Sequence, residues 1–199
     1  MKQKLIAEVK TKSPFHETVL NDTVNDFWEM FEFANRYGDI ISIHTDPRWG
    51  GSKDLIKAAR KITSKPILAK GIHENDYQIA ELFDIGVDYV LVVGRIPDCF
   101  DFKKILIEPL CLCELKKLND EKIYPKELSK DFQVVWNARN IVTGECRGGY
   151  REARKIWKGW LCQASMIRNA EDIQSDADAI LVGTFLENIV EGIKIGNND

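Results

Sequence analysis

Short apolar runs alternate with longer amphipathic segments along the whole 199-residue chain. Runs of strand length occupy residues 5–9, 40–44, 66–70, 88–93, 105–108, 132–136, 159–163 and 179–183. Segments with helical periodicity lie between or after them, at 22–38, 52–63, 74–86, 113–118, 148–159, 169–176 and 184–194. This alternation predicts strands that are buried on both faces of a parallel sheet and covered by helices.

Eight such units fit a closed (β/α)8 (TIM) barrel better than an open doubly wound sheet, which remains the alternative. The first run is not followed by GxGxxG, and the chain has no GxxxxGK[ST] segment, so the dinucleotide and P-loop interpretations lack their phosphate-binding loops. We therefore expect one compact barrel domain over residues 1–199.

The predicted barrel departs from regularity after its fourth strand. Residues 94–104 are too few for a full crossover helix, so the fourth βα unit is expected to be shortened. The polar segment 118–131, interrupted by Pro125, is expected to run over the surface. The first strand follows Met1 closely, so no helical extension is expected before it.

Composition favours a cytoplasmic protein that acts on a small molecule. A net charge of −3 gives no general attraction to nucleic acid or to a membrane surface. No apolar run approaches the roughly 20 residues that span a bilayer. The sequence leaves open whether the protein is a monomer or a homodimer.

The cysteines and histidines show no metal-binding spacing. The five cysteines lack a CxxC pair, so neither zinc nor a disulfide framework is expected, and Cys111 and Cys113 are predicted to pack as small apolar residues. His44 and His73 follow predicted strands and are expected to be hydrogen-bonded structural groups. The full sets are Cys99, Cys111, Cys113, Cys146 and Cys162, with His16, His44 and His73.

Polar residues gather where the predicted strands end, which is where barrel enzymes carry their chemistry. These candidates are Glu8, Lys10, Ser13, Lys70, Glu108, Asn137, Arg139, Ser165, Gly183 and Thr184. Lys70 ends an apolar strand, where burial is expected to lower its pKa and suit it to act as an acid. Glu108 is a candidate base, with Glu114 in its place if the register is shifted.

Two interpretations stay open for several of these residues. Glu8 and Lys10 point to the same face of a strand, either as site residues or as a structural ion pair. The turn at Gly183 and Thr184 precedes a helix, an arrangement that favours a bound phosphate but is common in α/β proteins. Trp49 beside Gly50 either covers an aromatic ligand or packs on the next helix.

Several of these segments, in this order, resemble indole-3-glycerol phosphate synthases. The matching stretches are AEVKTKSP (7–14), ISIHTDPRWGGSKDL (41–55), residues 65–93, ILIEPLCLCELKKL (105–118), WNARNI (136–141) and DADAILVGTFLE (176–187). The resemblance implies a carboxy-lyase of tryptophan biosynthesis without a cofactor or metal. Such an enzyme closes the ring of 1-(2-carboxyphenylamino)-1-deoxyribulose 5-phosphate with loss of carbon dioxide and water.

The resemblance also implies a role for each matching residue. Lys70 would be the general acid, Lys10 would hold the substrate carboxylate and assist dehydration, and Glu108 would accept a proton. Glu8 and Asn137 would orient these groups. Substrate would further be held by Ser13, Trp49, Arg139, Ser165, Gly183 and Thr184, with the phosphate on the last three.

Three departures from the family pattern keep other functions open. The aspartate and phenylalanine expected after Lys70 are Gly71 and Ile72, and the expected Glu-Ser-Gly-Ile appears as Ala164-Ser165-Met166-Ile167. The third departure is that the helical segment which usually precedes the first strand in this family is not expected here, because the strand begins within ten residues of Met1. The alternatives are a phosphosugar isomerase or aldolase-like lyase, with Lys70 as acid or Schiff-base amine, and a non-catalytic barrel that binds a phosphate ester or a partner enzyme.

Overall fold

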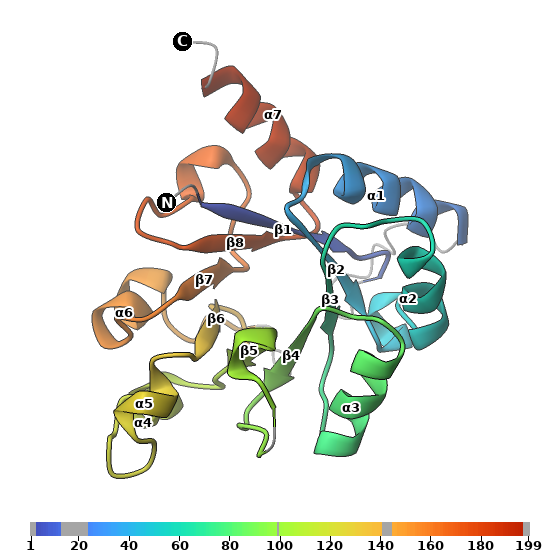
Figure 1. Cartoon of the computed structure of the whole chain (residues 1–199). Helices are drawn as coiled ribbons and strands as arrows, with labels where there is room; N and C mark the ends of the chain where they lie inside the picture. Colours follow the sequence, from blue (N-terminus) through green and yellow to red (C-terminus); the bar gives the residue numbers. More distant parts are fainter. Residues whose placement is uncertain (1–2, 13–23, 99, 141–144, 197–199) are drawn as a thin grey trace.

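The computed structural model describes residues 3–12, 24–98, 100–140 and 145–196. Within them, eight parallel strands close into one barrel in chain order, and β1 pairs with β8 (Figure 1). The strands are β1 (Lys4–Val9), β2 (Ile40–His44), β3 (Ile67–Lys70), β4 (Tyr89–Val93), β5 (Ile105–Glu108), β6 (Gln133–Asn137), β7 (Leu161–Ala164) and β8 (Ala179–Val182). The predicted (β/α)8 barrel and all eight strand segments are confirmed.

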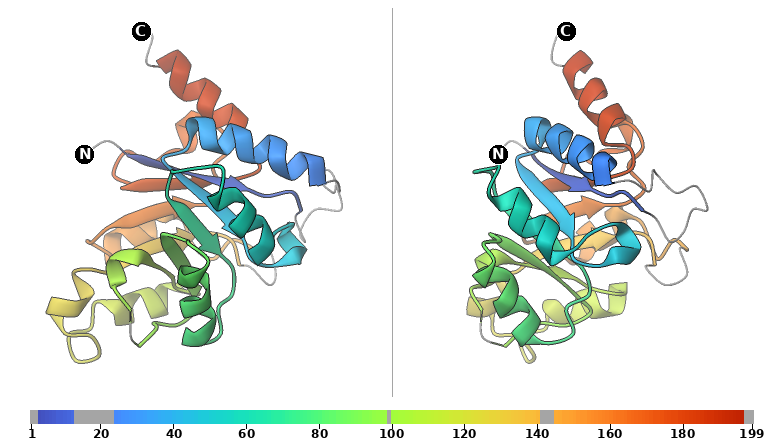
Figure 2. Two further views of the ribbon diagram at one scale, coloured as in Figure 1. Left: turned by 45° about the vertical axis from the view of Figure 1, so that its right-hand side comes forward. Right: turned by 90° about the vertical axis from the view of Figure 1, so that its right-hand side faces the viewer.

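Helices lie on the outside of the strands (Figure 2). They are α1 (Val24–Tyr37), α2 (Lys53–Arg60), α3 (Asp76–Asp84), α4 (Leu112–Leu118), α5 (Lys126–Ser129), α6 (Tyr150–Ile156) and α7 (Leu186–Gly196). Single 3-10 turns occur at η1 (Pro47–Trp49), η2 (Phe102–Lys104) and η3 (Ala170–Asp172). The shortened fourth unit is confirmed, since η2 is the helical element described between β4 and β5.

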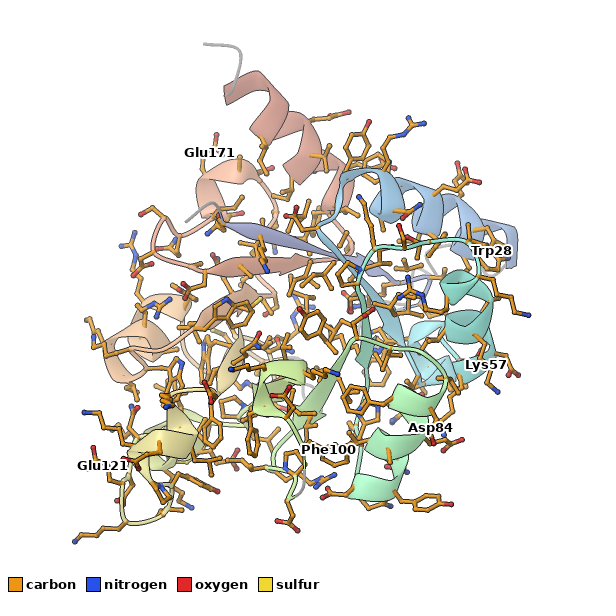
Figure 3. All side chains as sticks on the ribbon, viewed as in Figure 1. Trp28, Lys57, Asp84, Phe100, Glu121 and Glu171 are labelled. Atoms are coloured by element: carbon orange, nitrogen blue, oxygen red, sulfur yellow. A yellow bond between two sulfur atoms is a disulfide. The ribbon has the colours of Figure 1, made fainter. Side chains whose placement is uncertain are left out.

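Local capping and apolar spacing explain where the helices form. The Ser52 hydroxyl accepts a hydrogen bond from the Leu55 amide at the start of α2, and the Asn75 side chain does the same for Gln78 in α3. Ile56 of α2 and Ile79 of α3 are buried in the apolar core, as the spacing of apolar residues in these helices predicts. Charged side chains such as Lys57 and Glu121 lie at the periphery of the molecule (Figure 3).

Strand alternation separates two apolar layers. One lies between the strands and the helices, and the other fills the barrel interior. The interior layer consists of Ile6, Ile40, Leu68, Leu91, Leu106, Val135, Cys162, Ala164, Ala179 and Leu181. Side chains two residues apart on a strand lie on the same face, so the residues that continue this spacing beyond these interior side chains also point toward the barrel axis, at the strand ends. That face continues to Glu8, His44, Lys70, Glu108, Asn137 and Gly183.

Of two expectations about local structure, the one for residues 169–176 is wrong and the one for residues 118–131 is confirmed. Residues 169–176 form only the single turn η3, because the Asp172 carboxylate accepts the backbone N–H groups of Arg168 and Asn169 and closes a tight turn. The polar segment 118–131 does run over the surface, since none of residues 119–131 is buried. It contains the short helix α5, which begins directly after Pro125, a residue that favours helix starts.

The expectation for the cysteine pair is also wrong. Cys111 and Cys113 form a disulfide, with their Cα atoms 5.3 Å apart, and Cys113 is exposed. The bond is possible because Cys111 is the extended residue just before α4, which brings its sulfur back over the first turn of the helix. Cys146 is a free, exposed thiol and Cys162 a free, buried one, whereas Cys99 lies outside the described residues.

The described residues contain neither a candidate metal site nor a candidate membrane span. No group of three or more His, Cys, Asp or Glu side chains is placed to hold a metal ion there. Likewise, none of the described helices has the length and apolar character to cross a membrane.

Candidate active site

A cavity of about 150 Å³ lies at the carboxyl ends of the barrel strands. Its wall includes ten of the residues singled out from the sequence: Glu8, Lys10, Trp49, Lys70, Glu108, Asn137, Arg139, Ser165, Gly183 and Thr184. The structure thus brings together side chains from β1, β3, β5 and β6 and from the segments after β2, β7 and β8. Ser13, the remaining predicted residue, lies outside the described residues.

The first cluster in this cavity centres on the Glu8 carboxylate. Its Oε1 atom lies 2.5 Å from Lys70 Nζ and 2.9 Å from His44 Nε2. Burial raises the pKa of Glu8, but Lys70 and the hydrogen bond from His44 outweigh it and hold this pKa well below the ordinary value. Glu8 is therefore an ionised carboxylate at neutral pH, paired with Lys70 on another strand.

The pKa of Lys70 shifts in the direction opposite to the expected one. Burial lowers its pKa, yet the carboxylates of Glu8 and Glu108 more than offset that effect and raise the pKa above its usual value. The expected fall in the pKa of Lys70 is therefore wrong. Lys70 is an ammonium group at neutral pH, with a proton available to a ligand in the cavity.

Lys10 is the cation whose pKa falls. Burial is the main cause, Glu8 opposes it, and the neighbouring cations Lys70 and Arg139 lower the pKa further. Lys10 is half-buried in the cavity wall. Lys10, Lys70, Arg139 and Arg168 all line the cavity, and this excess of basic side chains favours an anionic ligand.

His44 belongs to the cavity wall, which its sequence position alone did not indicate. It is hydrogen-bonded, as expected, but its partner is Glu8, and its Nδ1 atom is buried without a hydrogen-bond partner. Burial is the main cause that lowers the pKa of His44, so the ring is neutral at neutral pH and Nε2–H donates to Glu8. The Trp49 ring stacks on His44, with ring centroids 5.3 Å apart and planes 6° apart.

His73 is the structural group that the sequence predicted. It is buried, and its Nδ1–H donates to the Leu91 carbonyl at 2.7 Å. Its Nε2 lies 3.3 Å from the Thr45 hydroxyl. Gly71 fits beside this pair because a Cβ atom there would lie 2.3 Å from Thr45 Oγ1. This packing gives a physical reason for the glycine that follows Lys70.

The second cluster surrounds Glu108, which ends β5 and is buried. Its Oε1 atom accepts hydrogen bonds from Asn137 Nδ2 and from an Arg147 guanidinium nitrogen, each at 3.1 Å. Burial raises the pKa of Glu108 above its ordinary value, although Lys70 and Arg147 act against it. Glu114 instead accepts a hydrogen bond from the Leu110 backbone N–H, so the alternative register is not needed.

Arg147 is the site residue that sequence reasoning missed. It lies on the connection between β6 and α6, and its side chain is 10 % exposed. The available signal was an arginine directly before the Gly148–Gly149 pair at a helix start, a pattern found in many loops. Nothing in the sequence shows that this loop folds back over Glu108.

The third cluster lies where β7 and β8 end. Ser165 and Met166 have backbone φ angles of 58° and 57°, a left-handed conformation that glycine adopts far more readily than methionine. The Ser165 hydroxyl is buried without a partner. Gly183 abuts Glu8, since a Cβ atom at this position would lie 2.4 Å from Glu8 Oε2. The helix α7 begins three residues later, at Leu186.

Comparisons with known proteins find relatives of this chain in one enzyme family. The family model described as indole-3-glycerol phosphate synthase matches residues 1–106. The chain is 33% identical to an indole-3-glycerol phosphate synthase from Sulfurisphaera tokodaii, over 93% of this chain and 78% of that protein. It is 28% identical to one from Lachnospira eligens, over 92% of this chain and 73% of the relative.

A solved structure supports the fold. Monomers of the dimeric phosphoribosylanthranilate isomerase from Thermotoga maritima superpose with a TM-score of 0.58 over 100% of both chains, at 10% sequence identity. At that identity the likeness concerns the barrel alone. The family model and the relative that is 33% identical are specific enough to assign a family. The chain belongs to the indole-3-glycerol phosphate synthase family.

Proposed function

We propose that this protein is a carbon–carbon lyase that converts 1-(2-carboxyphenylamino)-1-deoxyribulose 5-phosphate into indole-3-glycerol phosphate, carbon dioxide and water. Family membership supports the reaction. The observation that carries it to this chain is that Lys70, paired with Glu8, and Glu108, held by Asn137, line one cavity at the strand ends.

Lys70 is proposed as the general acid. When the ring carbon that bears the carboxylate attacks the ribulose carbonyl, the carbonyl oxygen gains negative charge and needs a proton. The raised pKa of Lys70 keeps its ammonium charged at neutral pH, and Glu8 fixes its position at 2.5 Å. Lys10 is proposed to hold the substrate carboxylate until it leaves as carbon dioxide.

Glu108 is proposed as the proton acceptor. After decarboxylation, the new hydroxyl leaves as water with the assistance of Lys10, and the carbon beside it loses a proton to form the indole ring. A carboxylate whose pKa is raised by burial is a stronger base than an ordinary glutamate. Asn137 and Arg147 both bind Oε1, which leaves Oε2 to face the substrate.

The phosphate is proposed to bind between the ends of β7 and β8. The unpartnered Ser165 hydroxyl is available as a donor there, with the backbone N–H groups of Gly183 and Thr184 near the start of α7. Arg139 lies in the same wall and supplies positive charge. Trp49, stacked on His44, is proposed to contact the aromatic ring of the substrate.

We further propose that residues 1–199 act as one domain, as a monomer or homodimer, on a diffusible phosphate ester in the cytoplasm. No nucleic acid or membrane partner is proposed, because the net charge of −3 supplies no basic surface for either. No cofactor is proposed for this chemistry. Side chains supply the acid and the base, and the reaction involves no net oxidation or reduction.

The test mixes purified protein with the carboxyphenylamino-deoxyribulose phosphate and follows indole fluorescence. Lys70→Ala should lower kcat by about 10²–10⁴-fold, the usual contribution of a general acid. Lys57→Ala, which removes an exposed lysine of α2, is the matched control and should leave the rate unchanged. Substrate binding without any fluorescence rise in the unmodified protein would refute the synthase proposal and favour a non-catalytic phosphate-ester barrel.

A further inference from the structure

Arg147 joins the ends of two neighbouring strands at the candidate site. Its Nε donates to the Asn137 carbonyl at 2.7 Å, one terminal nitrogen donates to the Leu110 carbonyl at 2.9 Å, and the other donates to Glu108 Oε1 at 3.1 Å. The guanidinium also lies over the Trp136 ring, 5.6 Å from its centroid. Three directed hydrogen bonds use the planar, forked geometry that distinguishes arginine from lysine, and the Trp136 ring adds a cation–π contact.

We propose that Arg147 is a positioning residue of the active site, which fixes the orientation of Glu108 and Asn137 and keeps Glu108 in its ionised, proton-accepting form. This inference rests on the proposed function for its catalytic meaning. Its electrostatic part concerns the unliganded protein and can be tested separately.

The cavity gives Glu108 a particular need for such a partner. Among the cavity-lining residues that the structure describes, the carboxylates are Glu8 and Glu108. Glu8 is already bound by Lys70 and His44. Ala164 stands at the position where the family pattern has a glutamate, so no carboxylate is supplied there. Glu108 is therefore the carboxylate available as a base, and it must stay ionised although it is buried.

Burial by itself favours the protonated form of Glu108, which cannot accept a proton. The groups that face it from the packed elements are Lys70 on β3, Asn137 on β6, Cys162 on β7 and Arg147. Lys70 is shared with Glu8, and the buried Cys162 thiol stays protonated because burial raises its pKa. Arg147 is thus the cation bonded to Glu108 and to no other carboxylate in the described part of the chain.

The position of Arg147 also explains how it acts on two residues at once. Its backbone N–H donates to the Ala138 carbonyl at 2.9 Å, so the loop is tied to the strand that carries Asn137. The Trp136 indole N–H donates to the Gly148 carbonyl at 3.0 Å and secures the next residue of the same loop. Arg147 is therefore held from both sides while its guanidinium spans the ends of β5 and β6.

Two variants separate the charge from the geometry. Arg147→Gln removes the charge, and Arg147→Lys keeps it but cannot make the three directed bonds. Arg151→Gln, on the exposed side of α6, is the matched control. The Glu108 carboxyl is followed by carbon-13 NMR in the unliganded protein, with Glu108→Gln assigning the signal, and kcat and KM are measured across pH.

Arg147→Gln should raise the midpoint of the Glu108 titration by about one pH unit, the low end of the effect of removing a neighbouring cation, and should move the acid limb of kcat/KM equally. Arg147→Lys should leave that midpoint near the original and lower kcat about tenfold with little change in KM. Arg151→Gln should match the unmodified protein in every measurement.

An unchanged Glu108 midpoint in folded Arg147→Gln would overturn the inference. If that variant does not fold, Arg147→Lys decides the question, and a kcat equal to that of the unmodified protein would overturn it. If the unmodified protein binds substrate without turnover while Arg147→Gln still shifts the Glu108 midpoint, the proposed reaction fails and the electrostatic role of Arg147 stands.

Discussion

Glu8 and Lys70 form a buried ion pair between β1 and β3, although 62 residues separate them along the chain. Strand β2 lies between the two strands and contributes His44 to the same Glu8 oxygen. The side chains of Glu8 and Lys70 are 6% and 16% exposed, so the pair lies largely out of solvent. Four predictions follow from this pair and from the neighbouring clusters.

Glu8→Gln should destabilise the fold by about 3 kcal/mol, because removal of one partner leaves a buried cation without its counter-charge. The folded-state pKa of Glu8 lies below the ordinary 4.5, so the ionised group stabilises the fold above about pH 4.5. That advantage over Glu8→Gln should disappear as the pH falls toward the folded-state pKa. Urea unfolding at several pH values measures it, with exposed Glu121→Gln as the control.

Glu108→Gln should have the opposite effect on stability. Because burial raises the pKa of Glu108, its ionised form costs stability at neutral pH, and a neutral amide removes that cost. The variant should unfold at a higher urea concentration than the unmodified protein at neutral pH. This difference should shrink as the pH falls through the folded-state pKa and vanish below the ordinary value of 4.5. Its kcat should fall by about 10²–10⁴-fold. A less stable variant at neutral pH would contradict the prediction.

Gly183→Ala should displace the Glu8 carboxylate, since the added Cβ would lie 2.4 Å from Glu8 Oε2. Overpacking of this kind costs about 1–3 kcal/mol, and the disturbed Glu8–Lys70 pair should lower kcat/KM at least tenfold. Unfolding curves and the fluorescence assay measure the two effects. Gly149→Ala is the control, because a Cβ atom at Gly149 meets no atom within 4 Å. Equal behaviour of the two variants would refute the steric account.

Met166→Gly should stabilise the protein by up to about 1 kcal/mol, because the residue has a φ of 57° and glycine adopts this conformation without a steric cost. Met166→Ala removes the same exposed side chain but keeps the strained backbone, so it should give no such gain. Thermal unfolding compares the two variants, and titration with inorganic phosphate tests whether glycine also strengthens anion binding. Equal stability in both variants would show that the backbone conformation is not the cause.

The local patterns in the chain were enough to predict the barrel. Apolar runs such as 179–182 mark strands because a strand that is buried on both faces is apolar along its length, and caps such as Ser52 mark helix starts. Residues 169–176 have the apolar periodicity of a helix but do not form one. The Asp172 carboxylate instead accepts backbone N–H groups and stabilises a tight turn. The Cys111–Cys113 bond was missed because spacing alone does not show that the two sulfur atoms approach each other.

The candidate site was only partly visible in the sequence. The positions of Lys70 and Asn137 at strand ends indicate site residues, because strand ends in a barrel share one rim, and both side chains line the cavity. His44 also ends a strand, but a histidine at that position is as compatible with a structural hydrogen bond as with a role in the site. Arg147 lies ten residues beyond Asn137 in a loop, and its contact with Glu108 depends on how that loop folds.

The sequence by itself determined the order of the eight strands, the polar residues at the ends of several of them, and the family pattern that these residues follow. Only the tertiary structure decided which charges meet: Glu8 with Lys70 and Glu108 with Arg147. The physical reason is that periodicity is a local property, written in neighbouring residues. Ion pairing and pKa depend on burial and on distances between residues that are remote in sequence, as the raised pKa of Lys70 shows.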